Sequence, residues 1–135
     1  MSSIRVVSLL EMEPELKGKV AGYFEDEGYC VRSFDGVIPF LEFLKNNPVS
    51  LALVGLSEKS EKDVLKLIVR QSPMASVILM TDLSETDVHE MAEGYGILGA
   101  VPRSEPVPAL KELKDRFEEI SGILESSLKS LPLAD

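Results

Sequence analysis

Residues 51–60 of the chain read LALVGLSEKS, an apolar run followed by a polar stretch. Four apolar residues, Leu51 to Val54, end at Gly55, and a polar stretch that begins at Ser57 leads into a segment with helical spacing. Such a short apolar run is typical of a strand that is buried on both faces of a parallel sheet. Functional groups of parallel sheets lie at the carboxyl ends of the strands, yet this strand ends in a residue without a side chain.

The rest of the chain alternates between short apolar runs and segments with helical spacing. Strands are predicted at 4–10, 29–34, 50–56, 76–80 and 99–101. Between and after them, apolar residues recur three and four positions apart, which indicates five helices. Proline, glycine and capping residues mark the helix ends, at Pro14, Gly28, Pro39, Ser60 with Asp63, and Ser84 with Asp87.

Five strands and five helices in strict alternation predict a parallel sheet, because each right-handed crossover requires a helix. For a chain of 135 residues, we expect one α/β domain with the flavodoxin-like doubly wound fold and the strand order 2-1-3-4-5. The functional crevice of this fold lies at the carboxyl ends of strands 1 and 3. Residues 10–13 and 55–59 are therefore expected to line it.

Composition excludes several classes of function. The formal net charge of −9 argues against binding to nucleic-acid phosphates or to an anionic membrane. No apolar stretch is long enough to span a membrane, and the N-terminal residues lack the features of a signal peptide, so we expect a cytoplasmic protein. One cysteine, Cys30, excludes an intrachain disulfide, and its strand-like setting predicts a small core residue.

Nucleotide and metal motifs are missing from the expected crevice. The first strand leads into LLEMEPEL, which has neither a dinucleotide-binding nor a P-loop glycine pattern. One histidine, His89, and one cysteine cannot form a His/Cys metal cluster. His89 falls on a predicted surface helix, far from any strand end. We therefore expect no cofactor.

Five segments carry a resemblance to a known family. They are EMEP at 11–14, EDEGYCVRSFDG at 25–36, NNPVSLALVG at 46–55, VILMTD at 77–82 and GILGAVPRSEP at 96–106. In this order and spacing, the chain from residue 4 to about residue 120 resembles the receiver domain of bacterial two-component response regulators. The resemblance implies a site with a phosphoacceptor aspartate, two acidic residues for Mg²⁺, a Thr or Ser, and a Lys.

The resemblance maps most of these functions onto altered residues. The phosphoacceptor position is Gly55, which has no group to phosphorylate, and the metal-binding pair falls on Glu11 and Met12. A thioether is a poor ligand for a hard Mg²⁺ ion. Thr81 matches the hydroxyl position, and Arg103 replaces the lysine. The position of the family's aromatic switch residue is occupied by Ala100.

A small polar cluster remains at the expected crevice, and it has two interpretations. Its members are Glu11, Glu13, Thr81, Asp82 and Arg103. In the first interpretation, Arg103 pairs with Glu11 or Glu13 and a salt bridge replaces the metal. In the second, a degenerate anion or metal site survives, with Glu11 and Glu13 as ligands. We favour the first, because a metal site without the aspartate and with Met12 would be weak.

The last helical segment continues beyond the usual length of a receiver domain. Its apolar residues follow the three- and four-residue spacing of a coiled-coil seam, at Leu110, Leu113, Phe117, Ile120 and Leu124. The first three are expected to pack on the sheet. Ile120 and Leu124 lie beyond it, which suggests a homodimer helix or a linker to an output domain. We divide the chain into a receiver-like domain at 1–121 and a helical extension or linker at 122–135.

These features predict a pseudo-receiver that is not an enzyme and acts through protein–protein contacts in bacterial signal transduction or transcriptional regulation. It would be an N-terminal regulatory module with a protein partner or an attached output domain. The expected partner surface comprises Val88, Tyr95, Ala100 and Pro102, with Ile120 and Leu124 of the extension. The alternative is an atypical receiver that still responds to phosphate, a metal or a small ligand at the altered crevice.

Overall fold

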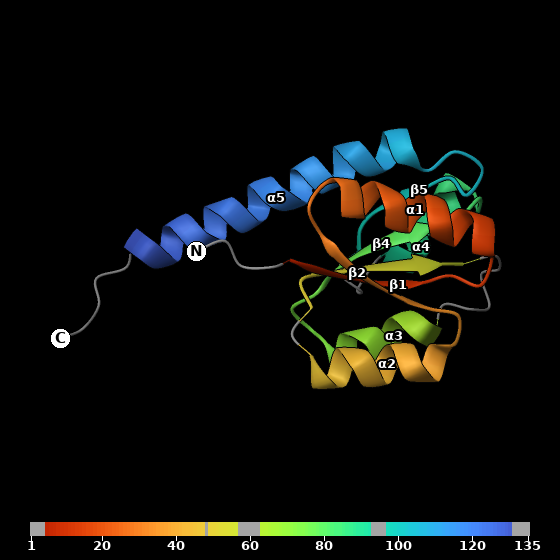
Figure 1. The fold of residues 1–135 in the computed structure, drawn as a ribbon, viewed down its shortest axis with the longest axis horizontal. Coiled ribbons are helices and arrows are strands. Elements are labelled where there is room, and N and C mark those ends of the chain that lie inside the picture. The colour runs from red at the N-terminus through yellow and green to blue at the C-terminus, as the bar shows by residue number, and fades with distance from the viewer. Residues whose placement is uncertain (1–4, 48, 57–62, 93–96, 131–135) are drawn as a thin grey trace.

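The computed structural model of the chain describes residues 5–47, 49–56, 63–92 and 97–130. Of residues 91–92 and 121–130 it describes the backbone alone. Strands and helices alternate in the predicted order (Figure 1). The elements are β1 (Val6–Leu10), α1 (Pro14–Asp26), β2 (Cys30–Phe34), α2 (Val37–Asn46), β3 (Leu51–Gly55), α3 (Asp63–Gln71), β4 (Ser76–Met80), α4 (Glu85–Ala92), β5 (Ile97–Val101) and α5 (Val107–Ser130).

The five strands form one parallel sheet in the order β2-β1-β3-β4-β5, which confirms the predicted flavodoxin-like fold. Strand β5 begins at Ile97, earlier than the predicted residue 99. A register shift at Val77 and Ile78 explains the difference, because it lets β5 keep pairing with β4 on both sides of the irregularity.

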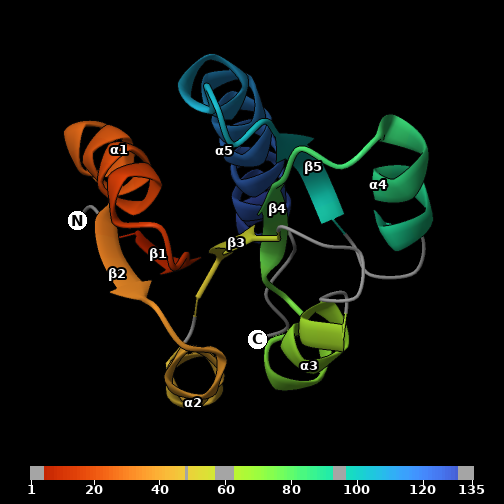
Figure 2. The same ribbon diagram turned by 90° about the vertical axis from the view of Figure 1, so that its right-hand side faces the viewer.

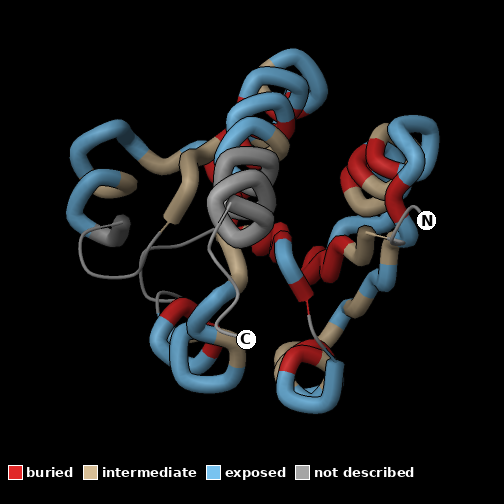
Figure 3. The backbone as a smooth tube through the Cα atoms, turned by 90° about the vertical axis from the view of Figure 1, so that its left-hand side faces the viewer, coloured by how far each residue is buried: buried red, intermediate tan, exposed pale blue. Residues whose placement is uncertain are grey.

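Two hydrophobic cores cover the two faces of the sheet. One core joins the sheet to α1 and α5, and the other joins it to α2 and α3 (Figure 2). Strand β3 supplies both, because Leu51 and Leu53 face the first core whereas Ala52 and Val54 face the second. The inner strands β1, β3 and β4 are mostly buried, whereas the edge strands β2 and β5 are mostly half-buried or exposed and the helices expose their outer faces (Figure 3). The apolar run of β3 is thus explained by its central position.

The helix ends follow the predicted signals. Pro14 is the first residue of α1, and Gly28 after its end has a φ of 91°, a conformation that favours glycine. Pro39 lies in the first turn of α2, where no backbone N–H is needed. The Ser84 hydroxyl caps α4 by accepting a hydrogen bond from the Asp87 N–H at 3.2 Å. Ser60, the predicted cap of α3, lies outside the described residues.

The prediction that Cys30 is a core residue is wrong, because its side chain is exposed. Cys30 begins β2, which is an edge strand of the sheet. The aromatic residues of α2 cover the other end of this strand, where Phe40 and Phe43 pack around Phe34 with ring centroids 6.0 and 5.3 Å away. The start of the strand has no such cover.

Helix α5 crosses the sheet and then continues past its edge (Figure 1). Leu110, Leu113 and Phe117 are buried against the sheet, as predicted, whereas the side chain of Ile120 is 43% exposed. Gly99 of β5 permits the close approach of the helix, because a Cβ at this position would lie 2.7 Å from Leu113 Cδ2. The first half of the helix therefore packs on the sheet, and its backbone then continues beyond the sheet (Figure 1).

A polar network at the amino-terminal edge of the sheet holds α5 where it leaves the domain. The Tyr29 hydroxyl donates a hydrogen bond to Glu118 Oε2 at 2.8 Å, and Arg5 Nη1 lies 3.4 Å from the same oxygen. The nearly buried Lys114 ammonium lies 3.2 Å from Glu27 Oε1 and 3.6 Å from Glu118 Oε1. Burial alone would lower the pKa of Lys114, but its contacts with Glu27 and Asp115 raise it, so the ammonium stays charged.

This network makes stability depend on the protonation of Tyr29. Burial and the Glu118 carboxylate raise the pKa of Tyr29 in the folded chain, despite the opposing effect of Arg5. A raised folded-state pKa gives stability that is present below the unfolded pKa of about 10 and is lost as the pH rises through the folded pKa. We predict that Tyr29→Phe lowers the free energy of unfolding by about 1 kcal/mol at pH 7.

Urea denaturation at a series of pH values measures this effect. The deficit of Tyr29→Phe relative to the unsubstituted chain should shrink above pH ~10, because the variant has no phenol to ionise. A constant deficit between pH 7 and pH 11 would show that the Tyr29 hydroxyl does not supply the pH dependence.

Candidate functional site

A buried ion pair joins two strands that are not neighbours in the sheet. Glu11 directly follows β1 and Arg103 lies two residues beyond the end of β5. Arg103 Nη1 and Nη2 donate hydrogen bonds of 2.8 Å each to Glu11 Oε1 and Oε2. The Arg103 side chain is 16% exposed and that of Glu11 is 3% exposed. Two parallel hydrogen bonds from one guanidinium fix both side chains in one geometry.

Neighbouring groups hold each partner of the pair. The backbone N–H of Glu13 donates to Glu11 Oε2 at 2.9 Å, and the Glu13 carboxylate lies 3.5 Å from Arg103 Nη2. The backbone N–H of Arg103 donates to Asp82 Oδ1 at 3.0 Å. The hydrogen bonds that Arg103 donates to Glu11 raise the pKa of the Arg103 guanidinium above its ordinary value, so it is charged at every working pH. Glu11 is therefore the main partner of Arg103, with two hydrogen bonds of 2.8 Å, and Glu13 is a more distant one at 3.5 Å.

The pair passes over the end of β3, and this explains the glycine at position 55. Strands β3 and β4 lie between β1 and β5, so a bridge between Glu11 and Arg103 must cross their ends. A Cβ on Gly55 would overlap Glu11 Oε1 and lie 2.9 Å from Arg103 Nη1. The backbone gives no other reason, because Gly28 is the one described glycine with a positive φ. Gly55 is required for space.

The other predicted site residues do not join this cluster. The Met12 side chain is 66% exposed, at the rim of the crevice. The hydroxyl of Thr81 is directed to its own loop, where it accepts a hydrogen bond from the Leu83 N–H at 3.2 Å. The structure thus brings Gly55, Glu11, Glu13 and Arg103 together, with the backbone of Arg103 anchored on Asp82.

The crevice above β1 and β3 has a volume of about 400 Å³ and is lined by Glu11, Met12, Glu13, Gly55 and Arg103. These residues do not fit the Mg²⁺ ion and phosphoryl group that a receiver site holds. Both oxygens of Glu11 are bound to the guanidinium, and the space beside Gly55 is filled. Among the described residues, no group of three or more His, Cys, Asp or Glu side chains is placed to bind a metal.

The expected partner residues fall in two places. Val88, Ala100 and Pro102 line one groove of about 630 Å³ between α4 and β5. Ile120 of α5 lines a different groove, together with residues at the ends of α2 and α3. Tyr95 and the side chain of Leu124 lie outside the described part of the chain. His89 is exposed on α4, as expected for a surface helix residue, but the expectation that it lies far from any strand end is wrong, because it lines the groove at the ends of β4 and β5.

Sequence reasoning missed two features. The first is the Tyr29, Lys114 and Glu118 network, whose residues lie too far apart in the sequence for any spacing rule to join them. The second is the steric role of Gly55, since the sequence showed a missing side chain but not what occupies its space. In the described part of the chain, no helix has both the length and the hydropathy that a bilayer span requires.

Comparison with known proteins gives a likeness in fold. No protein-family model and no curated protein matches the sequence. A CheY-like receiver domain protein from Methanospirillum hungatei JF-1 is similar with a TM-score of 0.74 at 17% identity, over 87% of this chain and 96% of that chain. A response regulator from Thermotoga maritima has a TM-score of 0.72 at 14% identity, over 85% and 98% of the two chains.

A longer protein shares the fold in one of its parts. NtrX from Brucella abortus is similar with a TM-score of 0.78 at 18% identity, over 98% of this chain and 31% of that chain. At these identities the likeness shows the architecture, and the chemistry has to be argued from the residues of the site. The chain has the fold of response-regulator receiver domains.

Proposed function

We propose that the chain is a pseudo-receiver, a module that does not accept a phosphoryl group and transmits signals in the cytoplasm through protein contacts. Its receiver-like body comprises residues 1–121, and residues 122–135 form an extension or linker. The fold supports a role in two-component signal transduction or transcriptional regulation, as an N-terminal module beside a protein partner or an attached output domain. On this proposal the chain itself is not an enzyme.

One observation carries the proposal: the Glu11–Arg103 pair fills the space beside Gly55. Phosphoryl transfer to a receiver requires a carboxylate nucleophile in line with the phosphorus atom and a cation that neutralises the phosphate. Gly55 supplies no nucleophile. The guanidinium of Arg103 neutralises Glu11 instead of a phosphate. A lost nucleophile together with a filled site supports a module with one resting arrangement.

The groove between α4 and β5, which adjoins the ion pair at Asp82 and Pro102, supports a contact role. Ala100 stands where the resemblance places a large aromatic residue, and its small side chain leaves the groove about 630 Å³ of open space. Val88 and Pro102 give this groove apolar walls. We assign this groove, with Tyr95, as the surface for an apolar side chain of a protein partner.

The absence of phosphate chemistry is testable with Mg²⁺ and beryllofluoride, a mimic of the phosphoryl group. We predict that amide NMR signals of Gly55 and Thr81 do not shift during this titration, because Gly55 supplies no nucleophile and both oxygens of Glu11 are bound to Arg103. The matched control is the triple variant Met12→Asp, Gly55→Asp and Arg103→Lys, which restores the carboxylates and the lysine and is expected to bind. Saturable shifts in the unsubstituted chain would favour the atypical phosphate-responsive receiver.

The steric role of Gly55 is testable by adding one methyl group. We predict that Gly55→Ala lowers the free energy of unfolding by about 1–3 kcal/mol, because the new Cβ must displace a buried ion pair. The control is Gly18→Ala in α1, where a Cβ meets no atom within 4 Å. A helix interior gains about 0.5–1 kcal/mol from this change. Equal effects of both substitutions in denaturant unfolding would contradict the steric explanation.

The ion pair itself is testable by removing its cation. Arg103→Ala leaves the carboxylate of Glu11, which is 3% exposed, without its partner. We predict a loss of about 3 kcal/mol in the free energy of unfolding, as expected for an uncompensated buried charge. Arg70→Ala, on the exposed face of α3, is the control and should change stability by less than about 0.5 kcal/mol. A similarly small loss in the free energy of unfolding for Arg103→Ala would show that the Glu11 carboxylate becomes hydrated when its partner is removed, and would contradict the prediction.

A further inference from the structure

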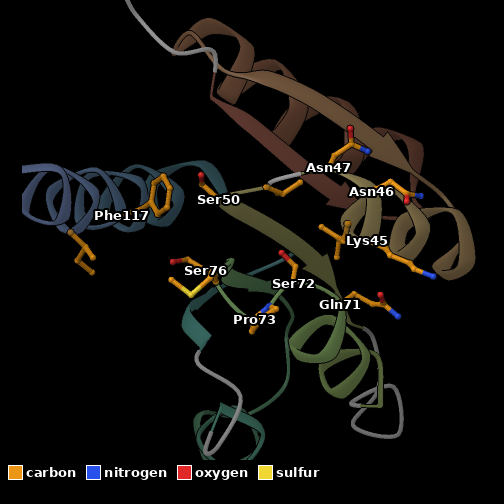
Figure 4. Close-up of a pocket in the computed structure, with 13 residues that line it drawn as sticks. Lys45, Asn46, Asn47, Ser50, Gln71, Ser72, Pro73, Ser76 and Phe117 are labelled. Carbon is orange, nitrogen blue, oxygen red and sulfur yellow. The ribbon is translucent and has the colours of Figure 1, made fainter. Parts of the chain in front are cut away.

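A second groove lies at the opposite edge of the sheet from the crevice. It has a volume of about 600 Å³ and lies between the ends of α2 and α3, the starts of β3 and β4, and the middle of α5 (Figure 4). Its floor is apolar, with the buried residues Leu44, Val49 and Phe117. Figure 4 shows Phe117 on α5 directed towards the starts of the two strands, at Ser50 and Ser76.

Two large apolar side chains at this groove face solvent. Met74 is 90% exposed and Ile120 is 43% exposed, and both line the groove. The groove adjoins α5 at the point where the helix loses its support from the sheet. Beyond Ile120 the sequence continues the apolar spacing with Ile123, Leu124 and Leu128. Among the described side chains, Met74 and Ile120 therefore leave apolar surface exposed at the groove, next to a helix whose sequence continues the apolar spacing.

The charges of the two surfaces are complementary. The rim of the groove carries amide and hydroxyl side chains, at Asn46, Asn47, Ser50, Gln71, Ser72 and Ser76. Lys45 is the one charged residue among the lining residues, and no carboxylate lines the groove. Beyond Glu118, whose carboxylate is bound within the chain, residues 119–129 of α5 contain Glu119 and Glu125 against one cation, Lys129. An acidic amphipathic helix thus matches a neutral to basic apolar groove.

We propose that this groove binds helix α5 of a second copy of the chain, in an antiparallel two-fold dimer. Helix α5 lines its own groove at Phe117 and Ile120, so each copy offers both a groove and a helix. This is the self-complementary arrangement that a two-fold axis requires. The inference goes beyond the proposed signalling function and does not depend on it.

The relative direction of the two α5 helices in the dimer follows from where each extension leaves its own groove, at Ile120. From Ile120 to Ser130 the helix advances about 15 Å, at 1.5 Å per residue. A parallel pair would carry both extensions away from both grooves and leave Met74 in solvent. An antiparallel pair carries the extension of each copy along the start of the other helix and into the other groove. The antiparallel pair therefore covers both apolar surfaces at once.

Sedimentation velocity with the full chain of 135 residues tests the dimer. We expect a dimer whose dissociation constant rises at least tenfold in Met74→Glu and in Ile120→Glu. Met74 is so exposed that its substitution leaves the fold intact, which circular dichroism verifies. The matched control is Ile38→Glu on α2, a 72% exposed apolar residue outside the groove, which should leave the dimer unchanged. A monomeric unsubstituted chain, or a dimer insensitive to Met74→Glu, would overturn the proposal.

Disulfide cross-linking tests the direction. In a Cys30→Ser background, the variants Asn47→Cys and Ser130→Cys each carry a single thiol, one at the groove and one at the end of α5. We expect a mixture of the two variants to form the mixed disulfide between positions 47 and 130 under mild oxidation. A predominance of disulfides between two copies of position 130 would indicate a parallel pair and would overturn the antiparallel arrangement.

Discussion

One interaction organises the carboxyl edge of the sheet: the ion pair of Glu11 and Arg103, which two parallel hydrogen bonds hold together. The pair joins the ends of β1 and β5 across the ends of β3 and β4. Three features depend on it: the glycine at position 55, the anchoring of the Arg103 backbone on Asp82, and the turn that Glu11 forms with the Glu13 N–H. Because the pair is buried, removing either residue would leave the other as an uncompensated buried charge, so the residue at each position limits what the other position can accept.

The fold could be predicted from the sequence almost completely, because it rests on local signals. The apolar run at 51–54, the proline at 14 and the glycine at 28 each act within a few residues of their own position, and all three predictions are confirmed. The prediction that Cys30 is a core residue was wrong, because the burial of this residue does not depend on local signals. Whether a residue of an edge strand is covered depends on the reach of a distant helix, here α2, and no spacing within the strand encodes that.

The site could be predicted only in part, because its central contact joins residues 92 positions apart. The sequence indicated which side chains meet at the carboxyl edge, and it left Glu11 and Glu13 as equal candidates for Arg103. Geometry separates them: Glu11 follows its strand directly and lies under the guanidinium, whereas Glu13 opens the next helix and is half exposed. The space that Gly55 leaves open is likewise a property of three strands together.

A fixed ion pair has a different consequence from a metal site in the same place. A metal and a phosphoryl group come and go, so a site that binds them has at least two states with different contacts. Glu11 and Arg103, in contrast, belong to the chain itself, so neither partner of the pair can dissociate as a metal or a phosphoryl group does. Under the proposed function, the crevice keeps this one arrangement, and a response begins at another surface of the chain. The groove beside the middle of α5 lies at the opposite edge of the sheet from the pair, whereas the groove between α4 and β5 adjoins the pair through Asp82 and Pro102. Regulation of this chain is therefore expected to depend on the concentration of its protein partners, which determines how often those two surfaces are covered.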